Sequence, residues 1–503
     1  MGVGGVGAGV VATGCGSPSE TPQSSAKGDV SQLLRTIPAR NPRGLSRLPR
    51  GERKTVLIVG GGIAGLSSAL ELSERGYEVT LKEAAPYLGG RLHTREESNA
   101  EGTFQVEHGL HMWFYQYYVF RDILQRLGVL QKYFRPFNEV YFHFKRYKPE
   151  LIRSEGFYPS NLLKIISDSP NLNFLDAIGM AGSMKDIAFY NFDNVRSRWD
   201  NISFAEWARR SRVNPKFYDI VMEPAAGVTL NDVEKISAAE MLTFMHLYFI
   251  GHPKAFDRWV TIEDHGTCVI DPWADKIRSY GGNIATNAPV QGLRFEKGLA
   301  VGEVGESKVY DEVILATDVG GTQRVLEGSR ADSGTSAAWR KLRDQVGAMR
   351  VAPHYKVWRL WLDKPTDPKR PSYQGVIETP ESAPIDLICL FHLLEKESAD
   401  WAKRRDGSVL EIHLYNIPKL RSASEDDLWK MLWPEVLLVL PELRGAKRLA
   451  SSIGSYDNFT SYEVGQWSKR PKSDGAVKAG VTNLGLAGDW IDTNYPSALM
   501  ERA

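Results

Sequence analysis

The chain has 503 residues, with 62 basic and 61 acidic side chains and a formal net charge of +1. Its content of 42% hydrophobic and 24% charged residues is that of a folded protein, and the balanced charge argues against a nucleic-acid binder. Cys15, Cys268 and Cys389 are too far apart for a CxxC pair or a disulfide framework, so we expect no metal site. No apolar run approaches the ~20 residues of a membrane-spanning helix.

The first 54 residues are expected to form a flexible leader and a basic linker. Residues 1–26 are rich in glycine, and the segment ending at Cys15 resembles the end of a bacterial lipoprotein signal. No basic residue precedes this apolar stretch, so a lipid anchor at Cys15 and a plain disordered leader both stay open. Arg35–Lys54 is basic and rich in proline, which is typical of a solvated arm and also suits an anionic membrane surface.

The folded part begins with a β-α-β unit. Thr55–Val59 is a continuous apolar run, as in a strand buried on both faces, and Ile63–Arg75 has apolar residues at helical spacing. Gly76 is the expected C-cap, and Glu78–Lys82 predicts the second strand. Such a unit in about 30 residues is the building block of a doubly wound sheet, so we expect an α/β protein with a Rossmann-like domain.

The turn between the first strand and the helix is a dinucleotide-binding motif. Its residues are Gly60, Gly62, Ile63, Ala64 and Gly65, with Glu83 and Ala84 at the end of the second strand. Gly60 allows the tight turn, Gly62 lets the backbone approach a pyrophosphate, and Gly65 lets helix and strand pack closely. The helix N-terminus attracts the phosphates. Glu83 suits ribose hydroxyl groups and argues against a 2′-phosphate.

The pattern beyond residue 115 is helical and aromatic-rich as far as about residue 250. Strand-like segments then return at Gly282–Thr286, Val290–Lys297, Ala300–Val304, Glu312–Ala316, Tyr355–Leu362, Val409–Tyr415 and Leu484–Ala487. Nucleotide-type motifs therefore lie near the start, middle and end of the folded part. We expect an FAD-binding domain assembled from residues 55–140, 256–330 and 476–503. Residues 141–255 are expected to form a helical, membrane-facing substrate region, and residues 331–475 a substrate region of strands and helices.

Two further motifs narrow the family. Leu88-Gly89-Gly90-Arg91 follows the second strand, and Gly488-Asp489 follows the last one. With the first motif they resemble the FAD-binding amine-oxidase superfamily, within it the carotenoid desaturases, and most closely bacterial β-carotene desaturase/methyltransferases of the isorenieratene-synthase type. The narrower likeness rests on His108–His111, Gln116–Tyr118, Ile236–Gly251, Val357–Leu362 and Tyr495–Ala503.

This resemblance implies a Rossmann-like, two-dinucleotide-binding FAD domain interleaved with an α+β substrate domain. It implies that Arg91, with Gly89 and Gly90, lies beside the FAD phosphates, and that Asp489, with Gly488, meets the ribityl chain and pyrophosphate. Val290 would lie in the strand that reads the adenine. Ala498 and Leu499, near the end of the chain, would also contact the cofactor.

The implied reaction is hydride abstraction by oxidised FAD from an apolar polyene, with a methyl shift if the substrate is a β-ionone ring. His111 would lie near the reactive face of the flavin, and Lys356 could hold a water at flavin N5, as a lysine does in many amine oxidases. Glu501 would touch the flavin or cap the terminal helix in which it lies. His108 departs from the family pattern, and the relatives continue beyond the position of Ala503, so a truncated chain is expected.

Two other functions stay open: a flavin amine oxidase acting on a soluble amine, and a non-catalytic FAD- or isoprenoid-binding protein. The leading hypothesis expects a carotenoid or isoprenoid substrate, and quinone or oxygen as electron acceptor. It also expects a bacterial enzyme at the membrane surface, with Tyr141–Leu163 dipping into the lipid interface. Lipid anchoring through Cys15 and a cytoplasmic location are the alternatives.

Overall fold

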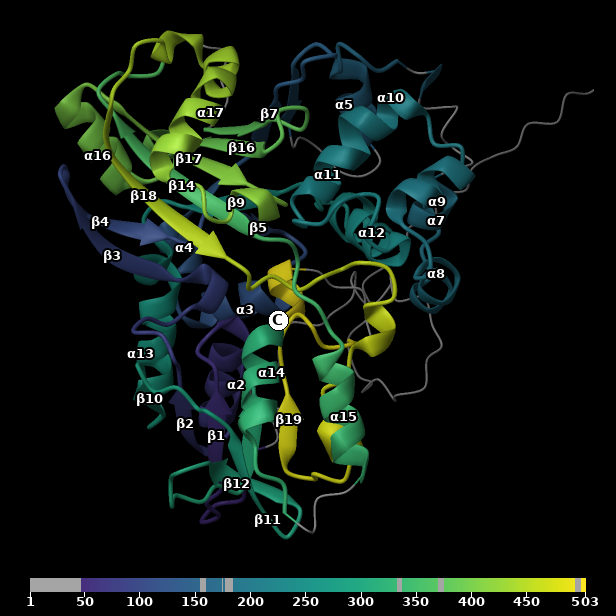
Figure 1. Cartoon of the computed structure of the whole chain (residues 1–503), viewed down its shortest axis with the longest axis vertical. Coiled ribbons are helices and arrows are strands. Elements are labelled where there is room, and N and C mark those ends of the chain that lie inside the picture. Colours follow the sequence, from purple (N-terminus) through teal and green to yellow (C-terminus); the bar gives the residue numbers. More distant parts are fainter. Residues whose placement is uncertain are drawn as a thin grey trace, which may run out of the picture.

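A computed structural model describes residues 47–153, 160–173, 175–176, 184–332, 337–369, 375–493 and 499–503. Cys15, the first part of the basic arm and Ala498 lie outside the described residues. Figure 1 shows a parallel sheet with its helices at one end of the molecule, and an antiparallel sheet and a group of helices at the other. The C-terminus lies between them. In the described part of the chain, no helix is both long enough and apolar enough to cross a bilayer.

The parallel sheet confirms the predicted Rossmann-like unit. Its strand order is β10 (Asn283–Ala285), β2 (Glu78–Lys82), β1 (Thr55–Val59), β13 (Glu312–Leu315) and β19 (Leu484–Leu486). Val56 and Ile58 of β1 pack on the side of α2 (Ile63–Glu74) and α13 (Asp271–Ser279). The alternate residues Leu57 and Val59 pack on the side of α14 (Val319–Gly328) and α15 (Ala337–Gly347). The central strand is thus buried on both faces, which explains its unbroken apolar sequence.

The turn after α2 has the expected glycine. Gly76 follows the last helical turn with φ +90°. Its N–H donates to the carbonyl of Ser73, and the N–H of Tyr77 donates to that of Leu72. This paired pattern is a Schellman motif, which requires a left-handed residue after the helix. It directs the chain straight into β2.

The second sheet has seven strands, mostly antiparallel. Its order is β18 (Arg448–Tyr456), β14 (Tyr355–Leu362), β17 (Ser408–Leu414), β16 (Ile385–Leu390), β15 (Val376–Glu378), β7 (Glu139–Phe142) and β8 (Glu150–Arg153). Helix α17 (Glu425–Val439) packs on one face through an apolar cluster that includes Trp358 and Leu360. The opposite face of β14 and β17 looks towards the parallel sheet. Helix α16 (Lys396–Arg405) precedes β17.

Smaller elements connect the two sheets. The strands are β3 (Thr94–Asn99), β4 (Gly102–Glu107), β5 (Trp113–Phe114), β6 (Phe134–Pro136), β9 (Arg258–Thr261), β11 (Leu293–Glu296) and β12 (Leu299–Glu303). The helices are α3 (Tyr118–Arg126), α4 (Leu130–Tyr133), α5 (Ser160–Asp168), α7 (Lys185–Ala188), α8 (Phe192–Trp199), α9 (Phe204–Arg210), α10 (Pro215–Phe217), α11 (Glu223–Gly227), α12 (Ala238–Met245) and α18 (Gly475–Lys478). Short non-α helical turns include η2 (Gly90–Leu92), η4 (His246–Ile250) and η10 (Leu499–Arg502).

Three sequence expectations need correction. The stretch beyond residue 115 contains the short strands β6, β7 and β8 besides α3 and α4, and the aromatic and β-branched residues of β6 and β7 suit a pleated surface. Val290 lies in the loop before β11 rather than in a strand. Helix α15 packs in the core of the parallel sheet through Trp339, Leu342 and Val346, so it does not belong with the substrate region predicted for residues 331–475.

Candidate functional site

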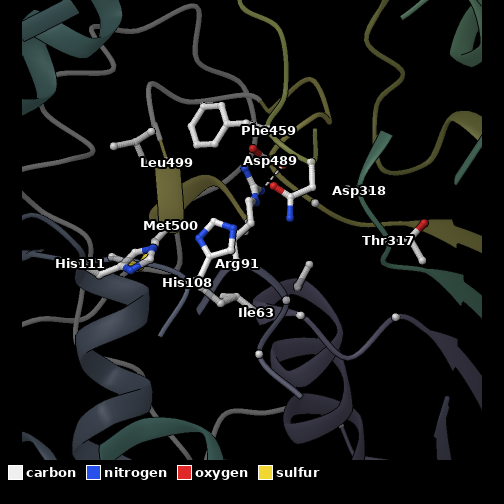
Figure 2. A pocket seen from close by; sticks show the side chains of 18 of the residues that line it. Ile63, Arg91, His108, His111, Thr317, Asp318, Phe459, Asp489, Leu499 and Met500 are labelled. Atoms are coloured by element: carbon white, nitrogen blue, oxygen red, sulfur yellow. Dashed lines mark ion pairs between the residues drawn. The ribbon is translucent and has the colours of Figure 1, made fainter. Parts of the chain in front are cut away.

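A single cavity of about 530 Å³ connects the two sheets. At one end it meets the carboxyl ends of β1, β2, β13 and β19, where open α/β sheets bind their ligands. At the other end its wall is formed by β14, β16 and β17 and by residues of α12 and η4. Figure 2 shows Arg91, His111 and Asp489, which come from separate parts of the chain, around the same space. The cavity therefore joins a nucleotide-type end to a second, more apolar end.

The glycine turn forms the floor of the nucleotide end. Gly60 has φ +107°, and its N–H donates to the carbonyl of Lys82 at 2.8 Å. A Cβ atom on Gly65 would lie 1.9 Å from the carbonyl oxygen of Gly60, so only glycine allows α2 to start here. Gly62 is the N-cap of α2 and has no capping side chain, and no acidic residue lies in the first turn. The helix therefore presents its positive N-terminus to the cavity.

Glu83 lies at the end of β2 and lines the same end of the cavity. Its carboxylate accepts hydrogen bonds from the backbone N–H groups of Gly61, at 2.6 Å, and Ala85, at 2.8 Å. These two bonds fix the carboxylate beside the glycine turn. A carboxylate has about four acceptor positions, so capacity remains for the hydroxyl groups of a ribose.

Arg91 and Asp489 form an ion pair across the cavity. Arg91 Nη2 lies 2.8 Å from Asp489 Oδ1, and the pair is drawn in Figure 2. Asp489 also accepts a hydrogen bond from the hydroxyl of Thr460 at 3.0 Å, and the Arg91 guanidinium stacks 4.9 Å from the ring centre of Phe459. Although burial opposes the charged form, the Asp489 carboxylate raises the pKa of Arg91 above its usual value. The site thus holds a fixed cation for phosphate and a fixed anion for hydroxyl groups.

His108 and His111 enter the cavity from the loop between β4 and β5. His108 Nε2 lies 3.0 Å from the hydroxyl of Tyr355, and His111 Nδ1 lies 2.8 Å from the carbonyl oxygen of Gly109. Burial lowers the pKa of His111 to about 4 and that of His108 well below its usual value. Both rings are therefore neutral near pH 7, and neither is a strong base.

The end of the cavity away from the glycine turn is apolar and aromatic. Its wall includes Phe114, Val228, Leu230, Phe244, Tyr248 and Leu387. The rings of Phe114 and Tyr248 meet edge to face with centroids 4.6 Å apart, and those of Phe244 and Tyr248 are 4.4 Å apart. This end can enclose an extended hydrocarbon and offers aromatic faces to a positive charge.

Most of the predicted site residues line this cavity. They are Gly60, Gly62, Ile63, Ala64, Glu83, Ala84, Gly89, Gly90, Arg91, His111, Val290, Gly488, Asp489 and Leu499. Gly65 does not line the cavity itself but packs against Gly60, which does. Ala498 is outside the described residues.

The predicted role of Lys356 is wrong. Its Nζ donates to the carbonyl of Ala423 at 3.2 Å, whereas its neighbours Tyr355 and Val357 line the cavity. Successive side chains of a strand point to opposite faces, so Lys356 of β14 shares the α17 face with Trp358. It has no access to a ligand in the cavity.

Glu501 caps helix α3, whereas the sequence left open a contact with the flavin or a cap of the terminal helix itself. Its carboxylate accepts hydrogen bonds from the backbone N–H groups of Val119, at 2.9 Å, and Phe120, at 3.2 Å. These groups belong to the first turn of α3, not to the terminal turn η10 that carries Glu501. Burial raises the pKa of Glu501 to about 8, although these bonds favour its ionised form.

Three polar residues in and directly after β17 belong to the site but were not predicted from the sequence. His413 and Tyr415 line the cavity, and Glu411 is hydrogen-bonded to His413 on the side away from Tyr415. Their spacing of two residues within a predicted strand could have placed them on one face. The sequence does not indicate that this face looks into the cavity, since every residue of β17 is buried.

The residues at the nucleotide end fit a flavin dinucleotide. A Cβ atom built on Gly62 would have Gly90 Cα, at 3.7 Å, as its one neighbour within 4 Å, so the space at the N-terminus of α2 is open. Glu83 suits a ribose, and Arg91 suits a pyrophosphate. Asp489 can accept hydrogen bonds from the hydroxyl groups of a ribityl chain.

Comparison with known proteins gives the family. The model of the flavin containing amine oxidoreductase family matches residues 63–503. The chain is 30% identical to a carotenoid phi-ring synthase of Streptomyces griseus, over 93% of this chain and 88% of that protein. It is 26% identical to a carotenoid phi-ring synthase of Chlorobaculum tepidum, over 90% and 86%. It is 23% identical to a zeta-carotene desaturase of Solanum lycopersicum, over 94% and 84%.

Solved structures share the fold at lower identity. A putrescine oxidase superposes with a TM-score of 0.62 and 14% identity, over 90% of this chain and 96% of that one. An oxidoreductase from Methanosarcina mazei superposes with a TM-score of 0.58 and 17% identity, over 89% and 97%. The matched family model, the shared fold and the geometry of the glycine turn agree: the chain belongs to the flavin containing amine oxidoreductase family and is a flavin-dependent oxidoreductase.

Proposed function

We propose that the protein is an FAD-dependent oxidoreductase that abstracts hydride from an apolar polyene, as a carotenoid desaturase does. The observation that carries the proposal is the continuous cavity, which runs from a dinucleotide end to an apolar, aromatic end. A β-ring carotenoid is the first substrate to test, because two relatives are named carotenoid phi-ring synthases. With such a ring, hydride loss would lead to a methyl shift and a second desaturation.

FAD, when bound, supplies the oxidant that accepts a hydride from carbon. Arg91 would hold its pyrophosphate, Glu83 its ribose, and Asp489 its ribityl hydroxyl groups. The neutral His111 would contact the reacting end of the substrate without competing for a proton. Loss of hydride leaves a cation on the substrate, and the rings of Phe114, Phe244 and Tyr248 would stabilise it by facing it with their π electrons.

Access from a membrane suits an apolar substrate. Three large apolar side chains of the helical region are exposed: Leu163 at 55%, Leu175 at 76% and Phe189 at 86%. They come from α5, from the short segment 175–176, and from the end of α7. We place peripheral membrane contact at these residues, with a quinone in the same bilayer or oxygen as the electron acceptor. Vesicle flotation of the protein and of a triple Ser variant of these residues tests this contact; equal flotation would contradict it.

The experiment for the main proposal uses cells that accumulate β-carotene or phytoene. Expression of the full chain should change the pigments to more unsaturated or aromatic-ring products, identified by chromatography and mass. The matched control is the Asp489→Asn variant, which should leave the pigments unchanged. Peroxide release from soluble amines without any polyene product would instead identify an amine oxidase. A bound flavin that neither polyenes nor amines can reduce anaerobically would identify a binding protein.

A further inference from the structure

Three polar side chains form a continuous row facing the cavity: Glu411 and His413 of β17, and Tyr415 directly after the strand. Glu411, His413 and Tyr415 stand two residues apart, so they point to the same side of the strand. Glu411 Oε1 lies 2.8 Å from His413 Nε2, and His413 Nδ1 lies 2.8 Å from the hydroxyl of Tyr415. The row therefore runs from a carboxylate inside the sheet to a phenol at the cavity wall.

The inner end of the row is a fixed negative charge. Arg359 of β14 lies directly opposite Glu411 in the sheet register, with Nη2 2.7 Å from Glu411 Oε2. Although burial opposes ionisation, Arg359 and His413 hold the pKa of Glu411 at about 2. A carboxylate has no hydrogen to donate, so Nε2 of His413 carries the hydrogen in their bond. In the neutral form of the ring, Nδ1 is then the nitrogen that accepts a hydrogen bond from the Tyr415 hydroxyl.

The loop that carries His111 is fastened to this row. The backbone N–H of Leu110 donates to Glu411 Oε1 at 2.9 Å. Gly109 has φ +139°, and a Cβ atom there would lie 3.0 Å from Cε1 of His413. The backbone of Gly109 thus packs directly against the His413 ring. The row and His111 are parts of one wall of the cavity.

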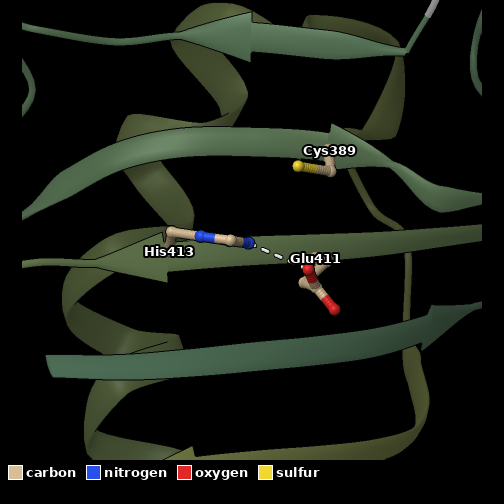
Figure 3. A group of neighbouring side chains, drawn as sticks. All are labelled: Cys389, Glu411 and His413. Carbon is tan, nitrogen blue, oxygen red and sulfur yellow. Dashed lines mark hydrogen bonds and ion pairs between the residues drawn. The ribbon is translucent and has the colours of Figure 1, made fainter. Parts of the chain in front are cut away.

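Cys389 of β16 lies opposite Glu411, on the side of β17 away from Arg359 (Figure 3). The atoms of Cys389, Glu411 and His413 that could bind a metal ion all lie within 4.8 Å of one another. Two features disfavour a metal ion there. The Arg359 guanidinium already occupies the Glu411 carboxylate and would repel a cation. Burial raises the pKa of the Cys389 thiol well above its usual value, which keeps it protonated. The geometry fits proton transfer better than metal binding.

We propose that Tyr415 and His413, backed by Glu411, accept the proton that the substrate loses after hydride abstraction; this inference rests on the proposed function. Each two-electron desaturation removes a hydride, for which the flavin is the acceptor, and a proton. The C–H bond next to the cationic carbon breaks, and its electron pair forms the new C=C bond. The proton moves to the Tyr415 oxygen while the hydroxyl's own proton moves to Nδ1 of His413. The resulting imidazolium is balanced by Glu411 and releases its proton to water after turnover.

The test uses the flavin-loaded full chain and a polyene that the wild-type protein converts. Tyr415→Phe and His413→Gln keep the shape of the row but break proton transfer, so single-turnover product formation should fall by about 10²-fold or more. Substrates deuterated separately at the hydride-donating and proton-losing carbons report which step limits the rate. In both variants the larger isotope effect should move to the proton-losing carbon. Imidazole in the buffer should partly restore the rate of His413→Ala.

The control separates chemistry from structure. His392→Gln removes another histidine of the same sheet region, one that binds the Val409 carbonyl and Thr366. It should leave the isotope pattern unchanged. Unchanged rates and isotope effects in Tyr415→Phe and His413→Gln, at normal flavin content, would overturn the relay. If the wild-type protein converts no polyene at all, the proposed function fails instead.

Discussion

Single side chains at the nucleotide end act through charge. Asp489→Asn removes the partner of Arg91, whose side chain is only 24% exposed. We expect the free energy of unfolding to fall by about 2–3 kcal/mol, since a charge-assisted hydrogen bond in a partly buried site is lost. Flavin content, measured from the absorbance of the purified protein, should fall as well.

The matched control for that prediction is Asp474→Asn. Asp474 pairs with Lys478 at the surface, where the two side chains are 51% and 65% exposed. Such a pair contributes about 0–1 kcal/mol, so stability and flavin content should barely change. Equal losses in the two variants would contradict a special role for the Arg91–Asp489 pair.

A second residue-scale prediction concerns space rather than charge. Gly65→Ala places a Cβ atom 1.9 Å from the carbonyl oxygen of Gly60, whose own N–H is bound to Lys82. Neither segment can move away without breaking the turn, so we expect a loss of about 3 kcal/mol and little bound flavin. Gly347→Ala, at the end of α15 with nothing within 4 Å, should change stability by less than about 0.5 kcal/mol. Denaturant unfolding of both variants checks the contrast.

These residues also show which parts of the site a sequence can predict. The glycines, Arg91 and Asp489 are tied to turns that directly follow parallel strands, so the motif itself places them. Lys356 was misplaced because all eight residues of β14 are buried, and an evenly buried strand does not show which side chains face a cavity. His413 and Tyr415 were missed for the same reason.

At the scale of elements, the chain end acts as a connector. Glu501 of η10 caps α3, and Arg502 of the same turn lies 3.2 Å from Glu240 of α12. Two helices that are far apart in sequence are thus joined by one short turn. Glu240 and Arg502 are both buried, and Arg470 also lies 2.7 Å from Glu240, so these charges are paired inside the protein.

The capping carboxyl should make stability depend on pH. The pKa of Glu501 is about 8 in the folded protein against 4.5 in its ordinary state, so the folded state holds a proton that the unfolded state has released. Relative to Glu501→Gln, the wild-type protein should therefore lose stability as pH rises from about 4.5 to about 8, by up to about 1.4 kcal/mol per pH unit. Denaturant unfolding of both proteins at pH 5, 6.5 and 8 measures this difference. The control for loss of a charge is Glu327→Gln, since Glu327 is exposed on α14. The stability of this variant should change with pH in the same way as that of the wild-type protein.

Strands that are buried on both faces were predicted well from the sequence. A strand whose start is set by a close backbone contact was predicted poorly. The strands of the parallel sheet were found within a residue or two, because their apolar runs are bounded by glycine. The strand expected from Val290 begins only at Leu293, since a Cβ atom on Gly292 would lie 2.2 Å from Gly328. That backbone contact with the end of α14 delays the start of pairing with β12, and periodicity alone cannot show it.

At the scale of the whole molecule, the cavity depends on both sheets at once. The parallel sheet takes its strands from residues 55–82, 283–315 and 484–486, and the chain passes through the second sheet between them. Neither unit is continuous in sequence, so neither can be removed without cutting the other. A ligand that contacts Glu83 at one end of the cavity and Tyr355 or His413 at the other is held by both units.

We therefore expect the two units to unfold together and to respond together to the cofactor. A ligand that binds only the folded state stabilises it by about 2.7 kcal/mol at a free concentration 100 times its Kd. Thermal unfolding of the flavin-free protein, followed by circular dichroism, should show one transition whose midpoint rises as FAD is added. FMN, which has the flavin but neither the pyrophosphate nor the adenosine, should raise the midpoint less, because Glu83 and the glycine turn then lack their partners. Two transitions, of which FAD shifts only one, would contradict this expectation and show that the parallel sheet binds the cofactor without help from the second sheet.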